Sequence, residues 1–524
     1  MQTGLVEGGK PSCLHVNTSS GVFAPTFTES QPDVASFLDI PFAEPPTGNL
    51  RFAPPVAKLY PGDDVVKASS LPPGCLQYVL PLLWGSVSLS GGPAREADFQ
   101  YGDYSNTTED CLRLSIFAPA ASLPRADDAV PEDGPLPVVI WVHGGGLSLG
   151  GINTPWWISS NWVQRSQAHI MVHIQYRVNL LGLPNAAGLA EEGQNLNLAY
   201  LDQRLAVEWV RDNIEHFGGD PERITLWGES AGGGSVDSYL FAWARDPIIK
   251  GAIADSGNAF GIEAMLAQPG DYSTFTQVAG QLGCGNLSPS EELQCMRLVP
   301  ESKLRQFLQA LPGEGGASDN NLVFGVPIDN VTTFSGYGDR ILEGFPKHST
   351  SIPLITGTLT NEGAAIVPWQ FEGTETATEV PATLAAAALG FKLGLQCTTL
   401  RDVRLRSEAG ATTYHFLYDG NFTNVSPLPW MGAYHTAELP MIMGTHEIQG
   451  PSGEFERSVS ERMQDVYMEF ARDPANGPAR AGWPPSVANL ETSEVAKWAG
   501  DGRVEQVITA KELRDECVEN GFEV

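Results

Sequence analysis

The pentapeptide Gly228-Glu229-Ser230-Ala231-Gly232 is the segment of the chain whose residue types point most directly to chemistry. It follows the apolar stretch 224–227, a pattern typical of a buried strand that turns sharply into a helix. Its glycines leave room, because a Cβ two residues to either side of the serine would collide with neighbouring backbone. Such a turn places the serine hydroxyl at a helix N-terminus, where negative charge is favoured. We therefore predict that Ser230 is a nucleophile.

A second Gly-x-Ser-x-Gly match, at residues 146–150, lacks these features, because leucine follows its serine, Ser148, and no strand pattern leads directly into it. It is the end of the run His143-Gly144-Gly145-Gly146, which follows the continuously apolar stretch 138–142. Glycines directly after a buried strand leave backbone N–H groups free to point at a developing oxyanion. We expect this loop to form an oxyanion hole, and the alternative is a plain glycine-rich turn.

A serine nucleophile of this kind needs an acid and a base, which follow it along the chain in the order serine, acid, histidine. Residues 352–356 have the composition of a buried strand, and the segment after them contains Glu362. Residues 412–418 predict another strand, and His435 lies in the segment after that one. This position distinguishes His435 from the other histidines, each of which alone is more typical of a surface or core residue: His15, His143, His169, His173, His216, His348, His415 and His446.

These motifs, with others along nearly the whole chain, resemble the type-B carboxylesterases, the family of cholinesterases, fungal lipases and related esterases. Residues 37–46 with 50–52, and residues 109–112, resemble its two signatures, and residues 202–221 resemble the helix and turn that lead to the serine. The resemblance is closest to fungal members. It implies the α/β-hydrolase fold, with a large mixed, mostly parallel central sheet and helices on both faces.

Carried over residue by residue, the resemblance implies Ser230 as nucleophile, His435 as base and Glu362 as the acid that orients it. It also implies an oxyanion hole built from three backbone N–H groups, those of Gly145, Gly146 and Ala231. No metal and no organic cofactor are expected.

Two further residues are singled out by the resemblance. Glu229, beside the nucleophile, would add negative potential, and Ser256 resembles a serine that lies behind the triad in relatives. For both residues the alternative is a purely structural role.

We expect hydrolysis of a medium or bulky organic ester through an acyl-enzyme. One alternative is an acyltransferase, transesterification or lactone-forming enzyme of secondary metabolism that uses the same triad, with an alcohol in place of water. A second is a non-catalytic binding module, against which the intact triad argues. Trp156 and Trp157, just past the oxyanion loop, are expected either to wall a substrate pocket or to be ordinary core residues. Cholinesterases have a choline-binding tryptophan near the end of their first disulfide loop. This chain has no tryptophan at the corresponding position, and the nearest one is Trp84.

The chain contains seven cysteines, and the family resemblance pairs six of them as Cys75–Cys111, Cys284–Cys295 and Cys397–Cys517, leaving Cys13 over. The first bridge would close a loop that contains the apolar stretch 79–84, expected either to cover bound substrate as a flap or to pack on the core. Disulfides are typical of secreted proteins, and the alternative is an intracellular enzyme with reduced thiols. Six Asn-x-Ser/Thr sequons agree with a secreted glycoprotein: Asn17, Asn106, Asn286, Asn330, Asn421 and Asn424. The first residues start no apolar signal segment, so secretion implies that one has been removed, which we favour.

Length and composition are consistent with these expectations. The 524 residues, 42% of them hydrophobic, are sufficient for a large core. Because the expected strands and helices interleave without a linker, we predict one domain over residues 1–524. A net charge of −31 disfavours nucleic acid and anionic membranes as partners and favours solubility, although it also allows steering of cationic substrates. No apolar run approaches the roughly 20 residues that span a bilayer.

Overall fold

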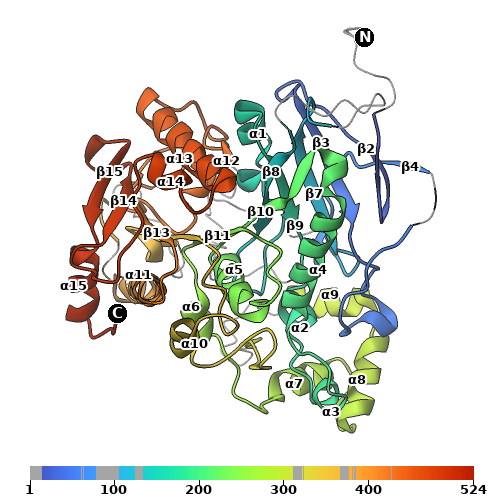
Figure 1. The fold of residues 1–524 in the computed structure, drawn as a ribbon. Helices are drawn as coiled ribbons and strands as arrows, with labels where there is room; N and C mark the ends of the chain where they lie inside the picture. The colour runs from blue at the N-terminus through green and yellow to red at the C-terminus, as the bar shows by residue number, and fades with distance from the viewer. Residues whose placement is uncertain are drawn as a thin grey trace.

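The computed structural model describes residues 14–60, 62, 64–77, 106–123, 134–310, 322, 324–365, 377–380, 382, 385–426 and 428–524. Its main feature is a twisted sheet of ten strands through the middle of the molecule (Figure 1). In sheet order the strands are β15 (Glu505–Thr509), β14 (Glu494–Trp498), β13 (Thr413–Tyr418), β12 (Leu354–Leu359), β11 (Gly251–Asp255), β10 (Gly219–Glu229), β8 (Leu136–Val142), β9 (Ile170–Ile174), β7 (Arg113–Pro119) and β3 (Val34–Pro41).

Pairing is parallel from β14 through to β9 and antiparallel at both ends, between β15 and β14 and among β9, β7 and β3. The predicted large, mixed and mostly parallel sheet is therefore confirmed. Because the carboxyl ends of parallel strands meet at one edge, the segments after β8, β10, β12 and β13 gather there. That residues 1–524 form a single domain stays a prediction.

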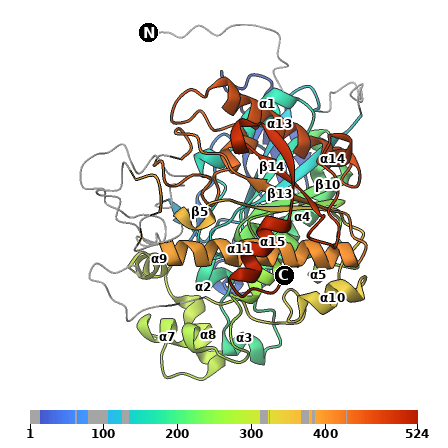
Figure 2. The same cartoon turned by 90° about the vertical axis from the view of Figure 1, so that its left-hand side faces the viewer.

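Helices cover both faces of the sheet. The larger ones are α4 (Leu198–Asn213), α5 (Ala231–Ala242), α11 (Ala385–Glu408) and α13 (Glu454–Arg472). Alternate residues of β8 belong to different cores, as period-two alternation requires. Val138 packs in a cluster with Val236 of α5, whereas Val139 packs in a second cluster with Val459 of α13. Figure 2 shows α11 running across the molecule beside α15.

The remaining α-helices of the described chain are shorter. They are α1 (Ser160–Ser166), α2 (Asn179–Gly182), α3 (Ala187–Glu191), α6 (Ala259–Glu263), α7 (Ser273–Gln281), α8 (Pro289–Leu298), α9 (Glu301–Ala310), α10 (Tyr337–Glu343), α12 (Leu439–Met443), α14 (Gly477–Arg480) and α15 (Lys511–Glu519). Two small sheets complete it, one of β1 (Val16–Thr18), β2 (Gly21–Ala24) and β4 (Val65–Lys67), the other of β5 (Gly74–Cys75) and β6 (Thr107–Thr108). Among the described residues, no helix has the length and apolarity that a membrane crossing requires.

Strand β12 differs from its expected position. The composition predicts a strand over 352–356, but β12 begins at Leu354 and continues to Leu359. Pro353 has no N–H to donate to a ladder, although its carbonyl accepts a hydrogen bond from the Ala252 N–H. The strand also includes Gly357, where a Cβ would lie 2.4 Å from atoms of the Phe416 ring. The turn toward Glu362 therefore begins later than the sequence indicates.

Three disulfides link Cys75 with Cys111, Cys284 with Cys295, and Cys397 with Cys517, so all three predicted pairs are confirmed. The third ties α11 to α15. Cys13, Trp84 and the apolar stretch 79–84 lie outside the described residues, so the flap hypothesis stays untested.

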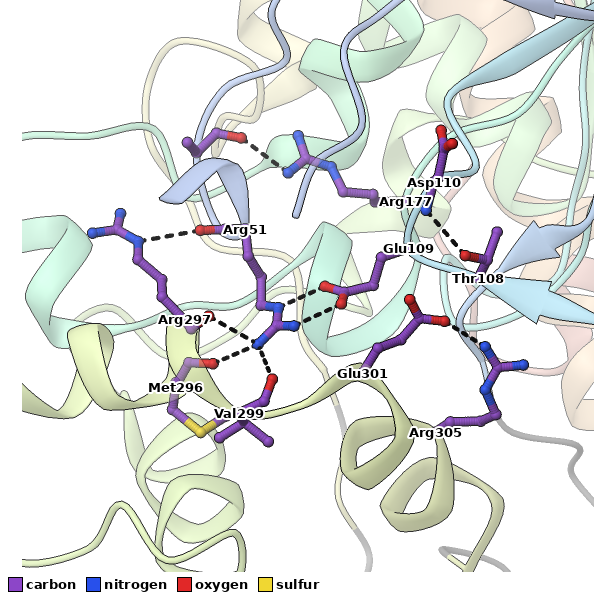
Figure 3. A network of polar contacts seen from close by, with 11 residues as sticks. Arg51, Thr108, Glu109, Asp110, Arg177, Met296, Arg297, Val299, Glu301 and Arg305 are labelled. Atoms are coloured by element: carbon purple, nitrogen blue, oxygen red, sulfur yellow. Dashed lines mark hydrogen bonds and ion pairs between the residues drawn. The ribbon is translucent and has the colours of Figure 1, made fainter. Parts of the chain in front are cut away.

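The buried side chain of Arg51 links the C-terminal end of α8 to Glu109, which lies in the loop closed by the Cys75–Cys111 disulfide (Figure 3). Both Arg51 and Glu109 are almost fully buried, and the guanidinium donates to the two carboxylate oxygens at 2.5 and 2.6 Å. Its remaining nitrogen, Nη1, donates to the carbonyls of Met296, Arg297 and Val299, at 2.8, 3.2 and 2.6 Å. A cation that caps the C-terminal carbonyls of a helix is stabilising. Arg51 thus holds together segments more than 240 residues apart in sequence.

Candidate active site

Ser230 lies at the sharp turn between β10 and α5. Its backbone angles are φ 57° and ψ −125°, a left-handed conformation that a residue with a side chain rarely adopts. The flanking glycines are required by close contacts: a Cβ on Gly228 would lie 2.4 Å from the Gly232 carbonyl carbon, and one on Gly232 would lie 2.2 Å from the Val142 oxygen. The steric reason given for the pentapeptide is therefore confirmed, and the serine side chain stays half-buried rather than enclosed.

The glycine loop after β8 lies against the serine. A Cβ on Gly144 would be 3.0 Å from the Ser230 Cβ, and Gly145, at φ 112°, has no room for a Cβ because the Leu149 carbonyl oxygen would be 2.2 Å away. Across the described residues, the backbone N–H groups of Gly145, Gly146 and Ala231 donate no hydrogen bond. Two of these donors thus lie on the glycine loop, and the third belongs to the first residue of α5, directly after the serine.

Buried side chains hold this loop in place. The ring of His143 stacks on Tyr176 with centroids 4.2 Å apart, and the Tyr176 hydroxyl donates to the His143 carbonyl at 2.7 Å. Burial lowers the pKa of His143 to about 4, so the ring is neutral near pH 7. Ser148, the serine of the second match, donates to the Gly146 carbonyl at 3.1 Å and is therefore part of the loop.

Glu362 and His435 meet as a fully buried pair. Glu362 begins η5 (Glu362–Ala365) after β12, and His435 lies between β13 and α12. The Nδ1 atom of His435 is 2.6 Å from Glu362 Oε2. The other carboxylate oxygen accepts from the Ser256 hydroxyl at 2.7 Å and from the Leu359 N–H at 2.9 Å. Both oxygens of Glu362 are thus hydrogen-bonded. When the neutral imidazole carries its hydrogen on Nδ1, the lone pair of Nε2 is free to accept a proton.

The Nε2 atom of His435 lies 3.1 Å from Glu229 Oε1. Burial raises the pKa of Glu229 well above its usual value, and the neighbouring carboxylates of Glu438, Glu362 and Asp255 raise it further. Within the described residues, the Ser230 hydroxyl makes no hydrogen bond to the imidazole; in free enzymes this bond is often long and tightens when substrate is bound.

Two buried acids in this region were not found by sequence reasoning. Glu438 is fully buried, and neither carboxylate oxygen has a hydrogen-bond partner in the described chain. Burial, followed by the charges of Asp255 and Glu362, raises its pKa well above the usual value. Asp255, at the end of β11, accepts from the Trp227 indole N–H at 2.7 Å and from the Tyr467 hydroxyl. The one sequence feature that could have indicated Glu438 is an acid three residues after His435 in an otherwise apolar segment.

The tryptophans after the glycine loop belong to the core. Trp156 and Trp157 are 3% and 5% exposed, and Trp157 packs edge-on against Trp141 of β8 with centroids 6.3 Å apart. A different aromatic ring lies beside the histidine: the half-buried Phe391 of α11 meets His435 edge-on, at 5.4 Å between centroids.

A model of the carboxylesterase family matches residues 13–389 and 385–514, which together span most of the chain. The chain belongs to the carboxylesterase family. Family membership establishes it as an ester-hydrolysing enzyme and agrees with the sheet described above.

Two relatives of this carboxylesterase that match almost its whole length are fungal. It is 58% identical over 519 residues to a protein named secreted lipase 5 from Gibberella zeae, covering 99% of this chain and 96% of the relative. It is 40% identical over 520 residues to a chlorogenic acid esterase from Aspergillus niger, covering 96% and 94%. Among solved structures, a PNB esterase matches with a TM-score of 0.72 at 24% identity, over 96% of this chain and 99% of the other. That similarity supports the predicted fold, the α/β-hydrolase fold.

Proposed function

We propose that this carboxylesterase cleaves its ester through the triad Ser230, His435 and Glu362. The observation that carries the proposal is the buried Glu362 carboxylate, which bonds His435 Nδ1 at 2.6 Å and is itself held by Ser256 and the Leu359 N–H. A carboxylate fixed in this way sets the tautomer of the imidazole and stabilises the imidazolium that forms during the reaction.

The chemistry follows from these groups. His435 Nε2 takes the proton of the Ser230 hydroxyl as its oxygen attacks the ester carbonyl. The free N–H groups of Gly145, Gly146 and Ala231 stabilise the oxyanion of the tetrahedral intermediate. The imidazolium then protonates the departing alcohol, which leaves an acyl-enzyme on Ser230, and water activated by the same histidine releases the acid.

The substrate in this proposal is a medium or bulky organic ester. Support comes from the named relatives, of which one is a chlorogenic acid esterase and one a lipase. Because both names denote ester cleavage, the acyltransferase alternative is not carried forward. We further propose that the enzyme is a single domain and is secreted, on the support of its three disulfides and of the relative named a secreted lipase.

The test compares two serines. Ser230→Ala is expected to lower hydrolysis of p-nitrophenyl esters by several orders of magnitude and to abolish labelling by a fluorophosphonate, with the unfolding midpoint retained. Ser148→Ala, in the second Gly-x-Ser-x-Gly match, is the matched control and is expected to keep its label. Loss of labelling in the Ser148 variant alone would overturn the assignment. A panel of alkyl, aryl and bulky natural-product esters then defines the substrate class.

A further inference from the structure

Asp255 occupies a position that joins the nucleophile to the acid. Its carbonyl accepts the Ser230 N–H at 2.8 Å, and the next residue, Ser256, donates through its hydroxyl to Glu362. The Asp255-Ser256 dipeptide therefore hydrogen-bonds to two members of the proposed triad, Ser230 and Glu362. The side chain of Asp255 has no part in the mechanism described above.

That side chain is a fully buried carboxylate held by two donors from other elements. The indole N–H of Trp227, on β10, donates to Oδ2 at 2.7 Å. The hydroxyl of Tyr467, on α13, lies 3.2 and 3.1 Å from the two oxygens. Register pairing also sets Asp255 beside Glu229 at the ends of β11 and β10, so two carboxylates lie next to each other. Like charges in this arrangement disfavour each other's ionisation.

The surroundings of Asp255 are acidic. Four buried carboxyls, those of Glu229, Asp255, Glu362 and Glu438, lie close enough to interact electrostatically, and two of them, Glu229 and Glu362, flank the imidazole of His435. In the described part of the chain, no Arg or Lys forms an ion pair with any of them.

In the part of the chain that the structure describes, α5 and β12, which also pack on β11, contain no Arg or Lys. From α5 the titratable side chains are Tyr239 and Asp237, and Asp237 is paired with Arg406. On β12 the register partner of Asp255 is Gly357, which does not titrate. The charge that Asp255 carries is therefore balanced by donors, not by a cation.

Burial raises the pKa of Asp255 to about 7, while the hydrogen bonds from Trp227 and Tyr467 lower it and Glu362 raises it. Asp255 thus has the donors that Glu438 lacks, and its charge changes close to neutral pH.

We propose that Asp255 is a positioning residue that acts through its charge: its ionised carboxylate favours the imidazolium of His435, and Trp227 and Tyr467 keep it ionised. The inference rests on the proposed triad. It assigns to Tyr467, a residue of α13 with no contact to the reacting atoms, an influence on the pH dependence of hydrolysis.

The experiment measures kcat/KM from pH 4.5 to 9 with a short-chain alkyl ester in a pH-stat. Asp255→Asn keeps the shape and removes the charge. We expect its acid limb to move to lower pH by about half to one unit, and its plateau to fall roughly 3- to 10-fold with KM unchanged. Tyr467→Phe removes one donor and leaves the carboxyl. We expect it to resemble Asp255→Asn at pH 6–7 and to regain the wild-type rate at pH 8.5–9, where Asp255 ionises without help.

Tyr414→Phe is the matched control, because this buried tyrosine also loses one hydroxyl hydrogen bond, to the Ala475 carbonyl, but faces no carboxylate of the site. Its acid limb is expected to stay in place. If the limbs of the Asp255 and Tyr467 variants coincide with that of the wild type, the proposal is overturned and the carboxylate is only structural. Labelling of wild-type enzyme at Ser230 by a fluorophosphonate keeps the two hypotheses apart: if Ser230 is not labelled, the triad fails instead. Should Asp255→Asn not fold, the recovery of Tyr467→Phe at high pH decides the question alone.

Discussion

The Oε1 atom of Glu229 lies 3.1 Å from Nε2 of His435, the ring nitrogen opposite the one that Glu362 holds. The imidazole therefore lies between two carboxyl groups. Glu362 is oriented by Ser256 and the Leu359 N–H, whereas Glu229 Oε1 has no hydrogen-bond partner among the described residues. In the proposed reaction the ring becomes an imidazolium, and Glu229 lies where it can pair with the second N–H.

Glu229→Gln tests this relationship. The amide has the same shape as the carboxyl but cannot ionise, so it cannot form an ion pair with the imidazolium that appears in the proposed reaction. We expect kcat to fall about tenfold, the equivalent of one pKa unit of lost interaction, with an unchanged unfolding midpoint. Steady-state kinetics at pH 7 give the measurement. A variant with wild-type kcat would show that Glu229 is only a structural residue.

Ser256→Ala tests whether the Ser256 hydroxyl holds the Glu362 carboxylate in position. The serine hydroxyl donates to Glu362 Oε1, and a hydrogen bond to a charged group contributes about 1.5–3 kcal/mol. We expect kcat to fall roughly 10- to 100-fold with KM little changed, because the substitution touches no substrate-binding surface. The wild-type enzyme is the comparison. An unchanged kcat in Ser256→Ala would remove Ser256 from the positioning chain.

Glu109→Gln tests the buried ion pair between Arg51 and Glu109, through which Arg51 joins the C-terminal end of α8 to the Cys75–Cys111 loop. Removing one partner leaves the Arg51 charge buried without compensation, so we expect a loss of about 3–5 kcal/mol in unfolding free energy. Glu343→Gln, in the exposed pair with Lys347, is the control and should change stability by less than about 1 kcal/mol. Denaturant titration measures both. Equal midpoints for the two variants would contradict the assignment.

Stability is expected to be highest on the acid side of neutral pH. Burial raises the pKa of Asp255 and Asp402 to about 7 and those of Glu229 and Glu438 well above their usual values. Native carboxyls with raised pKa values bind protons that the unfolded chain has released, so this contribution to stability is full below about pH 4 and is lost as pH rises from there through the native pKa values.

Buried histidines act in the opposite direction. Burial lowers the pKa of His143 and His415 to about 4, that of His169 and His173 to about 3, and that of His348 well below its usual value. Unfolded histidines take up protons below about pH 6.5, so this contribution to stability is lost as pH falls from there through the native pKa values. The contributions of the carboxyls and of the histidines to the unfolding free energy nearly offset each other between roughly pH 4.5 and 6.5. Thermal unfolding across pH 3–9 should show a broad maximum there, and a maximum at pH 8 or above would contradict the expectation.

The sequons are expected to differ in use when the enzyme is secreted from a eukaryotic host. Five of the six asparagines are exposed, namely Asn17, Asn106, Asn286, Asn330 and Asn421. Asn424 is half-buried, and its amide nitrogen donates to the carbonyls of His446 and Gly450 and to the Ser452 hydroxyl. A sugar on that nitrogen would displace these bonds. Enzymatic deglycosylation in ¹⁸O water, followed by peptide mass spectrometry, should label exposed sites and leave Asn424 unlabelled.

Much of the site could be predicted because its parts are local. The turn at Ser230 and the glycine loop are short motifs whose glycines have steric reasons that act within a few residues or against one neighbouring strand. The three disulfides followed from family resemblance. Asp255 could not be predicted, because its environment depends on the register of β10 and β11 and on the packing of α13. The start of β12 was displaced for a simpler reason, the missing N–H of Pro353.

The backbone of Ser230 has a consequence for how this enzyme changes under selection. Angles of φ 57° and ψ −125° are those of the first central residue of a type II′ turn, a position that glycine occupies without strain. The folded chain therefore stores conformational energy at the proposed nucleophile. Ser230→Gly would relax that strain and remove the hydroxyl in one step. A library screened for thermal tolerance alone would accordingly enrich inactive glycine variants at this position, and only a screen that also demands turnover retains the serine.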